Sequence, residues 1–110
     1  MRPVTIANLL SLPVRTRGIQ LGRPLAALLD ETDERLLGLE LLCGDGAHRF
    51  LPYSVADVRD AEIAVESALV LLDERHLAFY RERGRGPAEA GFAAPWVDEH
   101  GRVHEAQTAA

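Results

Sequence analysis

A short apolar run with a glycine-bounded turn behind it carries the strongest structural signal in this sequence. Residues 36–43 read LLGLELLC, and the segment Gly44-Asp45-Gly46 follows directly. An apolar run of this length between turn residues is typical of a strand that is buried on most of its surface. Glycine adopts a positive φ without steric cost, so the segment after the run predicts a hairpin turn. Because side chains alternate along a strand, we expect its odd-numbered residues to share one side: Leu37, Leu39, Leu41 and Cys43.

Short segments before and after this hairpin carry further strand signals. We expect strands at residues 8–14, 21–29, 47–53, from Val58 to the 63–66 segment, and at 69–72. The second of these is expected to be bent, because Gly22 and Pro24 disfavour a helix there. A charged turn at residues 30–35 separates it from the apolar run. Phe50 is the expected core residue of the strand that returns from the hairpin.

Several short strands joined by tight turns favour a small barrel or sandwich over a sheet with helical crossovers. We therefore predict an all-β fold for residues 1–72, a small closed or partly open β-barrel of about six strands. Closing a sheet also removes the exposed edges that invite aggregation.

The pattern changes from Asp73 onward, where Leu77 and Tyr80 lie three residues apart. Asp73 can cap a helix and Gly84 can end it, so residues 73–86 predict a short helix and its termination. Residues 87–110 form a C-terminal extension. The segment from Trp96 to His104 predicts a small hairpin, and a mobile tail is the alternative.

Charge and length exclude several classes of function. The formal net charge is -5, and all twelve basic residues are arginine. Because phosphate contacts supply most of the affinity of general nucleic-acid binders, this balance disfavours nucleic acid as a partner. The longest apolar stretches are far shorter than the roughly 20 residues that span a bilayer. Without a secretory signal pattern, and with Cys43 as the sole cysteine, the sequence leads us to expect a cytoplasmic protein.

Motifs for catalysis or cofactor binding are not apparent in the sequence. Cys43 ends an apolar run, where a thiol is typically buried and inert. His100 and His104 lie four residues apart, but Gly101 between them and the lack of a second pair of ligands argue against zinc. Asp30 and the acids after it lack the alternating pattern of a calcium loop. We therefore expect no catalytic residue, metal, cofactor or small-molecule substrate.

Two groups of residues are candidates for contact with a partner. The first is the basic cluster Arg81, Arg83 and Arg85, near the end of the predicted helix. Favourable interaction with the helix C-terminus, together with solvation, is the simpler explanation of this cluster, and docking to an acidic protein or to RNA is the functional one. The second is Phe92 with Trp96, the only tryptophan. Tryptophan is enriched at interface hot spots, but packing on the protein's own core is the alternative.

Several short segments in the first two thirds of the chain belong to one recurring pattern: Gly18-Ile19-Gln20-Leu21-Gly22, Leu28-Leu29-Asp30, Leu37-Gly38-Leu39, Arg49-Phe50-Leu51-Pro52, Val58 and Ile63-Ala64-Val65. With these residues the chain resembles the PRC-barrel family. The family includes the cytoplasmic domain of the photosynthetic reaction-centre H subunit and the C-terminal domain of a bacterial ribosome-maturation factor. The resemblance implies a six-stranded barrel that acts in docking or assembly and has no shared catalytic set.

Structural roles follow for Gly18, Gly22, Asp30, Gly44, Gly46, Phe50 and Pro52. We therefore expect a non-enzymatic interaction module that forms a homodimer or another homo-oligomer, or docks to another protein. An accessory protein of RNA or ribosome assembly and a small-ligand-binding barrel are the alternatives.

Overall fold

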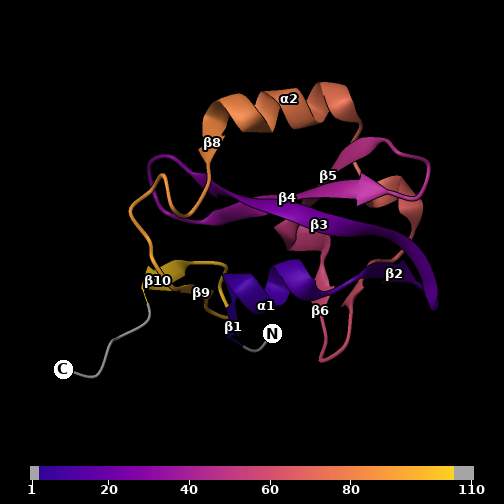
Figure 1. Ribbon diagram of the computed structural model, residues 1–110, viewed down its shortest axis with the longest axis horizontal. Coiled ribbons are helices and arrows are strands. Elements are labelled where there is room, and N and C mark those ends of the chain that lie inside the picture. The colour runs from indigo at the N-terminus through magenta and orange to yellow at the C-terminus, as the bar shows by residue number, and fades with distance from the viewer. Residues whose placement is uncertain (1–2, 106–110) are drawn as a thin grey trace.

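The computed structural model describes residues 3–105, which form two β-sheets, two α-helices and two 3₁₀ helices (Figure 1). The strands are β1 (Val4–Thr5), β2 (Val14–Thr16), β3 (Ile19–Asp30), β4 (Leu36–Cys43), β5 (His48–Pro52), β6 (Asp57–Val58), β7 (Ile63–Ala64), β8 (Gly84–Arg85), β9 (Pro95–Val97) and β10 (Val103–Glu105). The helices are α1 (Ile6–Ser11), η1 (Tyr53–Val55), η2 (Ala68–Val70) and α2 (Glu74–Arg83).

The larger sheet follows the order β5-β4-β3-β2-β7-β6, with β8 paired to the end of β3. The smaller sheet has the order β1-β9-β10. The larger sheet is open, because β5 and β6 lie at the two ends of its strand order and do not pair with each other within the described residues. The smaller sheet, with three strands, is open as well. A β-rich fold is confirmed, and the closed form of the predicted barrel is not.

The long hairpin of β3 and β4 is the centre of the larger sheet, and two β-bulges shape it. Leu28 pairs with Gly38 while Leu29 pairs with Leu36, so Leu37 is an extra residue on β4. A bulge interrupts the regular alternation of side chains between the two faces of a sheet. Leu39, Leu41 and Cys43 join the main core as predicted, whereas Leu37, at the bulge, packs with the smaller cluster on the other face.

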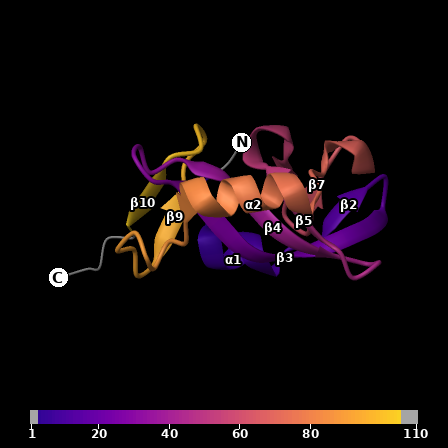
Figure 2. The ribbon, with the colours of Figure 1, turned by 90° about the horizontal axis from the view of Figure 1, so that it is seen from above.

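The two faces of this sheet are covered differently, as Figures 1 and 2 show. On one face α2 packs over β4 and β5, where Leu77, Leu28 and Phe50 form the smaller buried cluster. On the other face α1 and the smaller sheet close the main core, to which Leu9 and Val97 contribute fully buried side chains. The confirmed helix begins after Asp73, whose side chain accepts from the His76 N–H, and ends at Gly84.

The smaller sheet joins the two ends of the chain. Val4 of β1 pairs with Val97 of β9, and Val97 pairs in turn with Val103 of β10. The hairpin expected in the C-terminal extension is thereby confirmed, and its apolar side belongs to the main core. Residues 95–105 thus form two paired strands and the turn between them, and the last residues of the extension, 106–110, lie outside the described part of the chain.

Two predicted strands are wrong. Most of residues 8–14 belongs to α1, because Thr5 caps that helix by accepting from the Asn8 N–H at 3.1 Å. Only Val14–Thr16 is extended. Residues 69–72 hold the end of η2 instead, which Ser67 caps by accepting from the Leu69 N–H at 3.1 Å.

Glycines allow two tight turns and two close backbone contacts in the sheet. Gly46 has a φ of +85° in the β4–β5 turn, and Gly18 has a φ of +81° in the β2–β3 turn. Gly38 lies under the Phe50 ring, where an added Cβ would be 2.5 Å from Cζ. Gly22 faces the Leu42 carbonyl oxygen in the same way, at 2.7 Å.

Candidate protein-interaction groove

An open groove lies at the end of the larger sheet where the first part of β3 runs beside the β4–β5 turn. It consists of two adjoining hollows that share Gln20, Leu21, Cys43 and Gly44. The first hollow extends to Arg23 and Leu42. The second has a volume of about 440 Å³ and extends to Asp45, Arg49, Leu69 and Leu71. We call both hollows together the turn groove.

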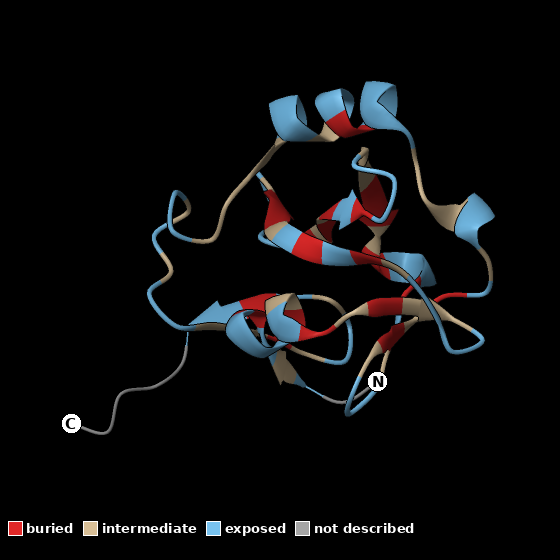
Figure 3. Ribbon diagram, turned by 45° about the vertical axis from the view of Figure 1, so that its right-hand side comes forward, coloured by how far each residue is buried: buried red, intermediate tan, exposed pale blue. Residues whose placement is uncertain are grey.

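The turn groove has an apolar wall with a protruding side chain beside it. Leu69 on η2 is 92% exposed, more than any other large apolar residue in the described chain. Leu42 on the opposite side is 42% exposed. Figure 3 shows η2 as an exposed turn at one end of the molecule. Exposed apolar side chains beside a concave surface are typical of interaction sites.

The charged side chains of the groove are one ion pair, between Arg49 and Asp45, and one arginine, Arg23. Arg49 binds Asp45 through two hydrogen bonds, of 3.0 and 2.8 Å. This guanidinium, with the Ala47 N–H, holds the pKa of the Asp45 carboxyl well below its usual range. Arg23 is exposed and forms no ion pair with any residue between 3 and 105. Cys43 lies buried at the boundary of the two hollows.

The predicted cluster of Arg81, Arg83 and Arg85 does not form one surface. Arg81 binds Glu40 on β4 through hydrogen bonds of 2.9 and 2.8 Å. Arg83 lies over the Phe79 ring, 4.4 Å from its centroid. Arg85 belongs to β8 and reaches the Glu31 carbonyl oxygen at 3.4 Å.

Glu40 connects β4 to α2 and to β5, a role that was not predicted from the sequence. Its side chain is 13% exposed and also lies 2.9 Å from His48 Nδ1 on β5. The Arg81 guanidinium, and after it His48, lower the pKa of the Glu40 carboxyl. The available signal was a single acid within the apolar run of residues 36–43, because a carboxylate in such a setting needs a cationic partner.

The aromatic candidates lie on the C-terminal segment. Trp96 stacks on His104 with ring centroids 4.6 Å apart. The Nε2 atom of His104 lies 2.7 Å from Asp98, so this nitrogen is engaged within the hairpin. Phe92 is half-buried and packs against the main core. His100 is paired with Glu99 instead, and the described residues contain no group of His, Cys, Asp and Glu that could hold a metal ion.

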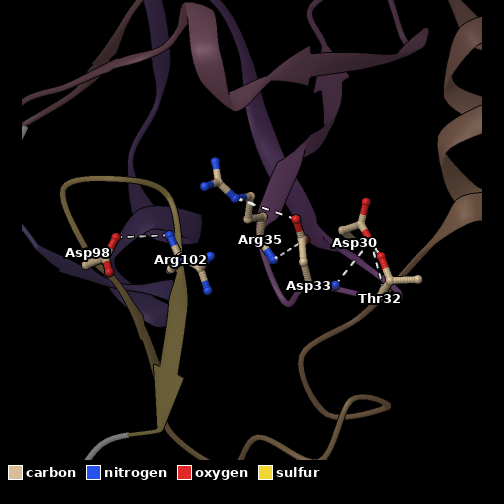
Figure 4. Close-up of polar contacts among 6 residues, drawn as sticks. All are labelled: Asp30, Thr32, Asp33, Arg35, Asp98 and Arg102. Atoms are coloured by element: carbon tan, nitrogen blue, oxygen red, sulfur yellow. Dashed lines mark hydrogen bonds and ion pairs between the residues drawn. The ribbon is translucent and has the colours of Figure 1, made fainter.

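The acidic turn at residues 30–35 is organised by its own backbone (Figure 4). Asp30 accepts from the Thr32 N–H at 2.8 Å and from the Thr32 hydroxyl at 2.6 Å. Asp33 accepts from the Arg35 N–H at 3.1 Å. The two bonds from Thr32, the hydroxyl first, lower the pKa of the Asp30 carboxyl. Together with the bond to Asp33 they explain the acids of the turn as loop-forming residues.

Comparison with known proteins adds no assignment. No protein-family model matches the chain, and no curated protein matches it in sequence. Within residues 3–105, no helix has both the length and the apolar character to cross a membrane.

Proposed function

We propose that this chain is a non-enzymatic interaction module that self-associates, two copies meeting through the turn groove. The observation that carries the proposal is the position of Leu69. A leucine that is 92% exposed stands beside an apolar hollow of the same molecule. The PRC-barrel resemblance, which implies a role in docking or assembly, agrees with this proposal.

A protruding side chain next to a hollow is self-complementary under two-fold symmetry. In an isologous dimer each patch contacts the same patch of the second copy. We place the two-fold axis of the dimer at the boundary of the two hollows. Leu69 of each copy then enters the first hollow of the other copy and packs against Leu42. Both apolar side chains then leave water, which is the main source of favourable association energy.

Charge supports the same arrangement. Arg23 lines only the first hollow and Asp45 only the second, so the two charges lie on different sides of the boundary between the hollows. The two-fold axis therefore places Arg23 of one copy beside Asp45 of the other. Asp45 Oδ1 accepts from both Arg49 and the Ala47 N–H, whereas Oδ2 accepts only from Arg49 and retains a second lone pair for the incoming guanidinium.

The alternatives have less support. An RNA-binding role rested on the family resemblance and on three arginines, one of which is bound to Glu40. A small-ligand site needs convergent polar groups in a concave pocket. In the turn groove Asp45 and Arg49 bind each other, and the remaining wall is largely aliphatic.

The first test is molar mass by light scattering over a concentration series. We expect the protein to shift from monomer to dimer, and Leu69→Asp to remain monomeric. Val55→Asp is the matched control, because Val55 is also an exposed aliphatic residue on a 3₁₀ helix but lies outside the groove. A wild-type protein that stays monomeric up to about millimolar concentration contradicts self-association, since binding weaker than this has a free energy of only about 4 kcal/mol.

A charge-exchange experiment tests the orientation. Arg23→Asp and Asp45→Arg each place like charges together in a homodimer, so each variant alone is expected to be monomeric. Mixing the two variants restores an opposite pair at both ends and is expected to give a heterodimer. If the mixture stays monomeric while the wild type dimerises, the two-fold arrangement is wrong.

A further inference from the structure

The outer face of α2 carries a second surface that the proposed self-association does not use. Arg75, Phe79 and Arg83 follow one another at four-residue intervals, so they lie along one side of the helix. Leu77, which lies on the opposite side, is the only buried residue of α2. Figures 2 and 3 show this outer side of α2 uncovered. We call the three residues the Arg–Phe–Arg stripe.

Phe79 is exposed and held in place at the same time. Its ring is 47% exposed, yet Arg83 lies over it at 4.4 Å and Tyr80 contacts it edge-on with centroids 5.3 Å apart. Tyr80 is stacked in turn on the buried Phe50. An aromatic anchor that is ordered before binding loses little entropy when a partner covers it.

The two arginines of the stripe have no direct ion-pair partner among residues 3–105, although Arg83 lies close enough to Asp30 to contribute to the lowered pKa of that carboxyl. Arg75 and Arg83 form no ion pair with any residue from 3 to 105, in contrast to Arg81, which binds Glu40. Glu74 and Glu82 also lie on the exposed surface of α2, but neither is within ion-pair distance of these two arginines. Two guanidinium groups outside any ion pair therefore flank one apolar ring, and Arg83 also contacts that ring, in a protein whose net charge is -5.

We propose that the Arg–Phe–Arg stripe docks an acidic segment of another protein. The eight steps from Arg75 to Arg83 span about 12 Å along a helix axis. In an extended segment, residues i, i+2 and i+4 share one face and span about 13 Å. The complementary segment thus carries two carboxylates with an apolar side chain between them at alternate positions. Each guanidinium binds a carboxylate with two parallel hydrogen bonds, and Phe79 packs on the central apolar side chain.

Other occupants match the stripe less well. A second copy placed isologously would bring four arginines together, and like charges oppose such contacts. Single-stranded RNA needs aromatic faces for its bases, and Arg83 occupies one face of Phe79. The acidic segment satisfies both the charges and the exposed ring edge.

The test uses a fluorescein-labelled peptide of sequence Glu-Ala-Leu-Ala-Glu, followed by anisotropy at low salt with the full chain. We expect saturable binding that weakens with added salt, since exposed charges are screened at a distance of about 10 Å in 0.1 M salt. The peptide Lys-Ala-Leu-Ala-Lys is expected not to bind. Arg83→Glu and Phe79→Ser are expected to weaken binding about tenfold or more, corresponding to at least about 1.4 kcal/mol.

Arg17→Glu is the matched control, because it makes the same change in net charge at an exposed arginine on the β2–β3 turn. It is expected to bind like the wild type. Equal binding by Arg83→Glu and the wild type, or no binding of the acidic peptide, overturns the proposal. So does a uridine oligonucleotide that binds through Arg83 where the peptide does not. The Leu69→Asp variant is expected to bind the peptide normally, which separates this surface from the turn groove.

Discussion

The Phe50 ring of β5 lies flat against Tyr80 of α2, with centroids 4.1 Å apart and planes inclined by 11°. Phe50 is fully buried, while Tyr80 is only half-buried. This stack joins α2 to the sheet on the face opposite the main core. Stability of the helix against the sheet therefore depends on a small second cluster, in which Leu77 is the central contribution from the helix.

Leu77→Ala is expected to destabilise the protein by about 2–4 kcal/mol, because it leaves a cavity in a cluster with few members. Leu69→Ala is the matched control and is expected to change stability by less than about 0.5 kcal/mol, since an exposed side chain loses no burial. Urea denaturation at low protein concentration measures both. Equal stabilities of the two variants would show that α2 is not packed as described.

Gly38→Ala is expected to destabilise the protein by about 1–3 kcal/mol, because the added methyl group must displace the Phe50 ring or the β5 backbone. Gly44→Ala provides the comparison. Nothing lies within 4 Å of its added Cβ and its backbone is outside the left-handed region, so we expect a change of at most about 0.5 kcal/mol. Thermal melts of both variants are sufficient, and a Gly38→Ala protein as stable as the wild type contradicts the close packing of Phe50.

The central hairpin could be predicted from sequence because local chemistry determined it. Residues 36–43 are apolar and the turn behind them is rich in glycine, so β4 and β5 occur where they were expected. The helix after Asp73 has both a cap and a stop in the sequence. Leu37 was placed on the wrong face because its position depends on a bulge, which is a property of the pairing with β3.

The misplaced segments depend on short-range caps that compete with strand signals. Thr5 and Ser67 each cap a turn of helix, and the apolar residues that follow resemble a strand when read alone. The turn groove could not be predicted, because Leu42 and Leu69 are brought to one end of the molecule only by the sheet topology. The basic cluster failed as a surface for the same reason, since Glu40 on β4 binds Arg81.

Glu40→Gln is expected to reduce stability near neutral pH by about 1 kcal/mol, because it weakens charged hydrogen bonds to Arg81 and His48. The folded-state pKa of Glu40 is lowered, so its contribution is present above the ordinary carboxyl range and is lost as the pH falls through the lowered value. The stability difference between wild type and variant should thus shrink below about pH 4.5. Urea midpoints measured from pH 7 to pH 3 test this, and a difference independent of pH contradicts the ion-pair role.

Asp98 is expected to hold the C-terminal hairpin in a pH-dependent way. Its carboxylate binds His104 Nε2 and the N–H groups of His100 and Arg102, and the His104 bond chiefly lowers its pKa to about 2. A lowered folded-state pKa stabilises the hairpin above the ordinary value of 3.8, and this stabilisation disappears as the pH falls toward 2. Because Trp96 is the only tryptophan and stacks on His104, its fluorescence reports the hairpin directly. We expect an acid transition in Trp96 emission between about pH 4 and pH 2 that is absent in Asp98→Asn, whose emission should resemble that of the acid form already at pH 6. Identical titrations of the two proteins would show that Asp98 does not hold the stack.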